Sequence, residues 1–271
     1  DFFAFSALFL LTPLLFRNYV HDFGRFDQIA ILFVLLQIHF AGDKTKSNWL
    51  LFFSPMLLLV HEAIALWAFP VILTIAFFEN RPMLYWIVPA SIVCAVSLIV
   101  WGGPDVDLHT YNERLQEWAR PVSIHWALVF SLTTDISEAV TRYIPYFWEV
   151  FNSPRGYLAL CFFLASALPL FLIKDRLLLF FNLAALMSAC TLFVLAVDYW
   201  RWVSLLGTII LFSLLYAHKK ALLSNPPQLG YYFMLIGVLG LFFEPVGIYP
   251  EILVGVDLPP KHLQFCGPKG G

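Results

Sequence analysis

Charged residues are scarce in this chain, and their scarcity indicates its broad class. Asp, Glu, Lys and Arg make up 13% of the 271 residues, whereas hydrophobic types make up 61%, and the mean hydropathy is +0.79. These values are far from ordinary soluble usage, so we expect a membrane protein with lipid as its solvent. The formal net charge of −2 gives no basic excess, and no nucleic-acid partner is predicted.

Cysteine and the common catalytic motifs are also sparse or missing. Cys94, Cys161 and Cys190 lie inside apolar runs and Cys266 lies in a polar tail, so neither a disulfide framework nor a CxxC metal site is indicated. The sequence contains no Gly-rich phosphate loop, nucleophile elbow or Cys–His nucleophile pair. No metal and no cofactor is therefore predicted.

Long apolar runs are what the chain does have. Residues 177–197 form 21 residues without a charged side chain, enough to cross a hydrocarbon core of about 30 Å at about 1.5 Å per residue. The runs predict an all-α, polytopic transmembrane helix bundle with about eight membrane segments, forming a single membrane domain over residues 1–271. They cover residues 2–16, 29–41, 49–78, 83–102, 157–173, 177–197, 202–216 and 231–247.

Two of these runs have more than one interpretation. Residues 49–78 are long enough for one helix, tilted or bent at Pro55 and Pro70, or for two half-helices. Residues 29–41 are short, so they form either a helix inside the bundle or a re-entrant piece. Because the chain begins at Asp1, without Met and directly in an apolar run, we expect its N-terminus to be truncated.

The Lys and Arg residues of the short loops predict the orientation in the membrane. The loops assigned to the cytoplasm carry Arg17 and Arg25 (with His21, Asp22 and Asp27 in the same turn), Arg81, Lys174 and Arg176, and Lys219 and Lys220. The external set then contains Lys44 and Lys46, the long loop 103–156 and the turn from Asp198 to Arg201. If residues 29–41 do not cross the membrane, the earlier loops change sides.

The long loop 103–156 carries two amphipathic patterns. Leu108, Tyr111, Leu115 and Trp118 recur at helical spacing, and so do Ile136, Val140, Ile144 and Phe147. We expect interfacial helices that either close the bundle against the headgroups or form a lid over an external active site.

His61 and Glu62 are the only ionisable residues of the run 49–78, where an unpaired carboxylate is costly. The sequence HEAIA is not a zincin site, because the second His required four residues on is Ala65. Either Glu62 only bonds a neighbouring helix, or the pair lies in a functional cavity or proton site.

Two further groups follow the ends of apolar runs. Asp198 and Arg201 have i,i+3 spacing, so either they pair at the bundle end or Arg201 presents its planar fork to a phosphate or pyrophosphate. Asp105 and Asp107 form a DxD pattern, which either begins a solvated loop or holds a cation beside a phosphorylated donor.

The order of these features resembles a known family. A GRFD-type turn, a His–Glu pair in an apolar helix, a long external loop and the sequence DYWRW at residues 198–202 are similar to O-antigen and exopolysaccharide polymerases of the Wzy/EpsG type. The resemblance implies a multi-pass protein of the bacterial inner membrane. It also implies a glycosyltransferase that joins sugars carried on undecaprenyl pyrophosphate at the external face, with Arg201 at the pyrophosphate.

The chemistry of such a reaction assigns roles to the candidate residues. The attacking sugar hydroxyl needs a base, for which His61 or Glu62 is the candidate, and the departing pyrophosphate needs a cation, for which Arg201 is the candidate. Asp198, Asp105 and Asp107 are substrate-binding candidates. Two alternatives remain open: a transporter or flippase with these residues along its path, and a non-catalytic membrane scaffold.

Overall fold

The computed structural model describes residues 27–61, 63–101, 144, 147–148, 151–195, 199–224 and 226–241, and all named elements among them are helices. The predicted all-α class is therefore confirmed for this part of the chain. The centre of the bundle consists of α3 (Asp27–His39), α5 (Ile64–Glu79), α11 (Arg176–Cys190) and α13 (Tyr199–Lys219), which pack against one another.

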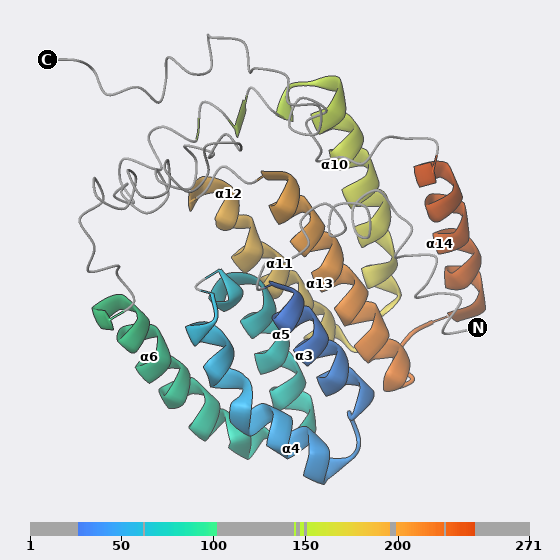
Figure 1. Ribbon diagram of the computed structural model, residues 1–271. Coiled ribbons are helices and arrows are strands. Elements are labelled where there is room, and N and C mark those ends of the chain that lie inside the picture. The colour runs from blue at the N-terminus through green and yellow to red at the C-terminus, as the bar shows by residue number, and fades with distance from the viewer. Residues whose placement is uncertain are drawn as a thin grey trace, which may run out of the picture.

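The other helices surround this centre (Figure 1). On one side lie α4 (Lys44–Phe53), the 3₁₀ helix η1 (Ser54–Leu59), η2 (Arg81–Met83) and α6 (Leu84–Trp101). On the other side lie α10 (Pro154–Ala167), η3 (Leu168–Leu172) and α14 (Pro226–Leu241), while the short α12 (Leu192–Leu195) extends α11. Most of the predicted runs thus correspond to helices, with ends that differ by a few residues.

Side-chain caps fix where several of these helices begin. Asp43 precedes α4 and accepts a hydrogen bond from the Lys46 amide at 3.2 Å. Asp175 precedes α11 and accepts from the amides of Leu177 and Leu178 at 2.8 and 3.0 Å. Each carboxylate satisfies amides that have no partner within the helix and lies at the positive end of the helix dipole.

The run 49–78 is not one helix but a helical hairpin. After α4 and η1 the chain turns at residues 60–63, and α5 returns to the starting level, where the Gly42 amide donates to Glu79 Oε2 at 2.9 Å. Pro55 lies in the first turn of η1, where its missing amide costs nothing. Of the alternatives for this run, the two shorter helices are correct, and His61 lies at the turn rather than in mid-helix.

Two helical stretches among the described residues are long and apolar enough to cross a membrane: Arg176–Val194, with 19 residues, and Trp202–Lys219, with 18. Of the other apolar helices, α6 has 18 residues and α3, α5, α10 and α14 have 13–16, and about 16 residues cover only about 24 Å. Pro70 and Pro89 lie inside α5 and α6 without ending them, and the 3₁₀ helix η3 follows α10. Of the eight predicted spans, two thus have full length among the described residues, while the run 2–16 and the end of the run 231–247 lie outside them.

Seven Lys and Arg residues of the described part lie at one end of the bundle, whereas Arg155 and Arg201, in the first turns of α10 and α13, lie at the other. The former end, the basic end, consists of Lys44, Lys46, Arg81, Lys174, Arg176, Lys219 and Lys220. The prediction that Lys44 and Lys46 lie on the side opposite Arg81 was wrong, because the hairpin brings the chain back to the level from which it started. We call the opposite end, where α5 and α13 begin, the His61 end.

Candidate functional site

His61 is the one predicted site residue whose side chain the structure describes. It lies in the turn between η1 and α5, is half-buried, and accepts a hydrogen bond from the Ala63 amide at Nδ1 over 3.0 Å. The side chain thereby supplies a cap for α5, whose N-cap residue Ala63 has no capping side chain. Because Nδ1 accepts, the neutral ring carries its proton on Nε2 and presents a donor there.

The other predicted site residues are described in part or not at all. Arg201 lies in the first turn of α13, although only its backbone is described. Glu62, Asp198, Asp105 and Asp107 lie outside the described residues, as does nearly all of the loop 103–156 with its predicted interfacial helices. Their proposed roles stay predictions.

The register between α5 and α13 relates His61 to Arg201. The two helices are in contact, run in the same direction and are joined near their ends by Tyr216, whose hydroxyl donates to Glu79 Oε1 at 2.8 Å. Fifteen residues back from Glu79 is Ile64, and fifteen back from Tyr216 is Arg201. At about 1.5 Å per residue both positions lie about 22 Å from this link. The His61 turn and the first turn of α13 are therefore at the same level of the bundle.

Asp27 lies at this end too, and sequence reasoning missed it. It is the first residue of α3, its exposed fraction is 2%, and it precedes Gly42 by the same fifteen residues. Because α3 packs against both α5 and α13, Asp27 belongs to the level of Ile64 and Arg201. The prediction that Asp27 lies on the same side as Arg81 was wrong, since α3 leads from Asp27 to the basic end at Gly42.

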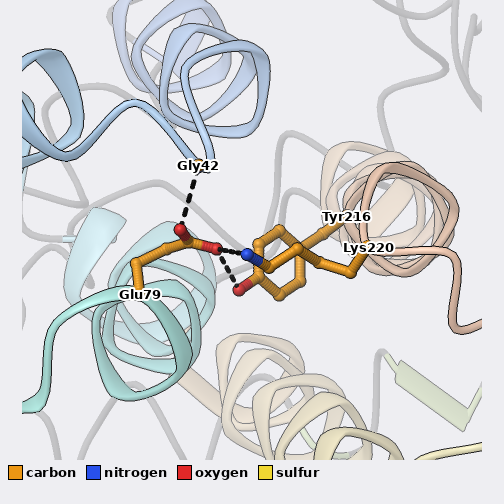
Figure 2. Close-up of polar contacts among 4 residues, drawn as sticks. All are labelled: Gly42, Glu79, Tyr216 and Lys220. Atoms are coloured by element: carbon orange, nitrogen blue, oxygen red, sulfur yellow. Dashed lines mark hydrogen bonds and ion pairs between the residues drawn. The ribbon is translucent and has the colours of Figure 1, made fainter.

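Glu79 is the best-connected carboxylate in the described part of the chain, and it lies at the basic end (Figure 2). Gly42 donates its amide to Oε2, while Tyr216 and Lys220 meet Oε1 at 2.8 and 2.6 Å. The four residues come from three separate segments, so the carboxylate joins the α3–α4 turn, the end of α5 and the end of α13. Both its oxygens are bound by donors of this chain, which is typical of a structural link rather than of a substrate site.

Comparisons with known proteins assign no function to this chain, so the candidate site is described from its geometry alone. The chain matches no protein-family model, no curated protein and no solved structure. Among the described residues no three His, Cys, Asp or Glu side chains gather where they could hold a metal ion. The groups at the His61 end are the His61 ring, the buried carboxylate of Asp27 and the start of α13 with Arg201.

Proposed function

We propose that this protein is a polytopic membrane glycosyltransferase of the polysaccharide-polymerase type. It joins sugar units carried on undecaprenyl pyrophosphate, and it does so at the external face of a bacterial inner membrane. The proposal rests on the positions of His61 and Arg201, which lie at the same level of the bundle and far from its basic end. The described helices next to Glu62, Asp105 and Asp198 also begin or end at the His61 end, namely α5, α6 and α13.

The outer surface of the bundle supports the membrane part of the proposal. Only 39% of the stretch Arg176–Val194 is buried, although its mean hydropathy is 2.2. On α6, Ile92 and Val93 are 59% and 65% exposed, and Met187 on α11 is 69% exposed. Soluble monomers rarely expose contiguous apolar surface of this kind, whereas lipid acyl chains cover it at no cost.

The proposed reaction forms one bond and breaks one bond. A hydroxyl oxygen of the acceptor sugar attacks the anomeric carbon of the donor, and the bond from that carbon to the pyrophosphate oxygen breaks. The hydroxyl proton goes to a base, and undecaprenyl pyrophosphate departs with the electron pair. Since His61 Nδ1 already accepts the Ala63 amide, we assign the base to Glu62 and a positioning hydrogen bond to His61 Nε2.

Arg201 has the complementary role at the leaving group. Its guanidinium forms two parallel hydrogen bonds to a pyrophosphate oxygen pair and stabilises the charge that develops there. A site between helices also lets the prenyl tail remain in the bilayer during the reaction. Asp198, Asp105 and Asp107 are assigned to sugar or pyrophosphate binding, as the resemblance and the DxD pattern suggest.

The test compares matched substitutions at the two ends of the bundle. We expect Arg201→Lys to reduce polymer formation by at least about tenfold, because Lys keeps the charge but loses the fork. Glu62→Gln should have a similar effect. Arg81→Lys, the same substitution at the basic end, is the control and should leave the polymer length profile unchanged. A normal profile in Arg201→Lys or Glu62→Gln cells with matched protein levels would contradict the catalytic assignment.

Transport is the second candidate, and buried polar groups favour it. Gln37 is fully buried, and neither polar atom of its amide has a hydrogen-bond partner among the described residues; the same holds for Asn182 Nδ2. Such groups line aqueous or substrate paths in transporters. An assay with the purified protein in lipid vesicles distinguishes polymerisation from transport. Movement of lipid-linked sugar across the bilayer without chain extension would replace the polymerase proposal with the transport proposal.

A further inference from the structure

The basic end is one continuous surface rather than four separate loops. The Glu79 carboxylate joins the α3–α4 turn to the end of α13, and Asn80 Nδ2 donates to Asn48 Oδ1 at 2.8 Å. The connection after α13 joins the one before α11 through the Lys174 amide, which donates to the Leu222 carbonyl at 2.8 Å. The cations on these connections are thus held in a fixed arrangement.

The carboxylates of this surface are occupied, whereas most of its cations are not. Glu79 is bound by Lys220, Asp175 caps α11, and Asp43 caps α4 and meets Lys46 at 3.5 Å. In the part of the chain that the structure describes, five exposed cations make no ion pair with any carboxylate: Arg81, which lies over the Phe77 ring at 4.1 Å, and Lys44, Lys174, Arg176 and Lys219. The surface therefore has a net positive charge directed away from the bundle.

A belt of exposed aromatic rings lies just inside this charged surface. Trp49, Trp86 and Tyr231 are 61%, 46% and 71% exposed, and each lies five residues after the first residue of a helical segment at the basic end. Five residues correspond to about 7–8 Å along a helix. The Trp86 ring stacks on Phe52 at 4.9 Å and its Nε1 donates to the Phe52 carbonyl at 3.1 Å. Amphipathic rings at such a level mark the boundary between headgroups and acyl chains.

We propose that the basic end is a docking surface for the headgroups of anionic phospholipids, such as phosphatidylglycerol, in the cytoplasmic leaflet. The cations meet the phosphates, the rings lie at the level of the lipid carbonyls, and the apolar flanks beyond them meet the acyl chains. A soluble anion would account for the charges but not for the belt. The inference rests on the membrane location in the proposed function and not on its sugar chemistry.

The experiment measures which lipids stay bound to the whole 271-residue chain. The protein is purified in micelles containing equal amounts of phosphatidylglycerol and phosphatidylcholine, and the retained lipids are quantified. Each basic residue near an anionic surface strengthens binding roughly fivefold, so we expect the wild type to prefer phosphatidylglycerol by at least about tenfold. The combined change Lys44→Gln, Lys174→Gln, Arg176→Gln and Lys219→Gln should bring the ratio close to one.

Two control variants test whether the lipid preference depends on charge, and whether it is independent of the proposed catalytic site. Lys44→Arg, Lys174→Arg and Lys219→Arg together keep the charge and should keep the preference, while Arg201→Lys, at the other end, should not change it. Should the glutamine variant fail to fold, salt gives an independent test on the wild type, whose preference should fall sharply at about 0.5 M NaCl.

Four results would overturn the proposal. The first two are equal retention of both lipids by the wild type and an unchanged lipid preference in a folded glutamine variant. The third is displacement of the lipid by inorganic phosphate at about 10 mM, a concentration that only partly screens the surface potential. The fourth is a wild-type dimer that dissociates when the glutamine changes are made. The last result would assign the surface to a second copy of the chain.

Discussion

At the scale of single residues, Glu79 shows how a carboxylate stays charged at the edge of an apolar bundle. Burial raises the pKa of Glu79, but the hydrogen bonds from Lys220 and Tyr216, the charge of Lys220 and the Gly42 amide outweigh it. Together they hold this pKa below its ordinary value of 4.5. The native state therefore binds fewer protons than the unfolded state just below that pH, and its stability depends on the ionised form.

This dependence predicts a loss of stability in acid. Stability from Glu79 is fully present above about pH 4.5 and is lost as the pH falls through the lowered native pKa. At neutral pH, Glu79→Gln should lower the free energy of unfolding by roughly 1–3 kcal/mol, because it leaves Lys220 without its charged partner. It should also flatten the acid decline. Thermal unfolding in detergent between about pH 7 and pH 3 measures both effects.

The exposed pair of Lys46 and Asp43 provides the control for this prediction. Their side chains are 61% and 43% exposed, so Lys46→Gln should leave the free energy of unfolding almost unchanged. An acid decline that is equally steep in the wild type and in Glu79→Gln would contradict the role given to Glu79.

The tertiary contacts of Glu79 and the capping contact of His61 could not be predicted from sequence patterns. Glu79 lies 37 residues from Gly42 and 137 residues from Tyr216, and no local spacing links them. His61 was recognised because a polar pair in an apolar run is conspicuous, but its capping bond to Ala63 depends on a turn that hydropathy does not reveal. Asp27 was interpreted as part of an anchoring turn, because charged groups commonly cluster at helix ends.

At the scale of elements, apolar run length predicted most helices but not where the chain reverses. The predicted run 157–173 corresponds to α10 and η3, and the run 202–216 lies within α13. The hairpin formed by α4, η1 and α5 was one of two interpretations, because its turn at residues 60–63 interrupts the hydropathy only with His61 and Glu62. Reversal follows from packing of α5 against α3 and α11, which a one-dimensional pattern does not contain.

The end of α13 offers a test at this scale. Ala221 has a φ of +57°, in the left-handed region, and the Leu222 amide donates to the Ala217 carbonyl at 2.8 Å, as in a Schellman motif. Glycine is the usual residue there because it avoids the Cβ clash of about 1–2 kcal/mol.

Ala221→Gly should therefore raise the free energy of unfolding by roughly 0.5–1 kcal/mol, after the larger entropy of glycine in the unfolded chain is subtracted. Gly42→Ala is the opposite case, because Gly42 has a φ of +96° and its replacement adds strain although no atom lies within 4 Å of the new Cβ. Melting temperatures of both variants in one detergent measure the two effects, and a lower value for Ala221→Gly would contradict the assignment of this cap.

At the scale of the whole molecule, the two ends of the bundle differ in chemistry. Seven Lys and Arg residues lie at the basic end, whereas His61, the buried Asp27 and the starts of α10 and α13, with Arg155 and Arg201, lie at the other. Positive loops remain in the cytoplasm, so this separation predicts that the basic end is cytoplasmic and the His61 end external. The hairpin strengthens the argument, because it moves Lys44 and Lys46 to the side of the other cations.

The orientation can be tested with single cysteines placed in the full chain. In a background where the four native cysteines are replaced, we expect a cysteine at Asn152 to react with a membrane-impermeant maleimide in intact cells. Cysteines at Thr45 and Lys174 should react only after permeabilisation, since both positions lie at the basic end with Glu79 and Lys220. Labelling at Thr45 but not at Lys174 in intact cells would contradict the hairpin. Labelling at both positions but not at Asn152 would reverse the orientation and place His61 and Arg201 on the cytoplasmic side, where a polymerase acting on external lipid-linked sugars has no substrate.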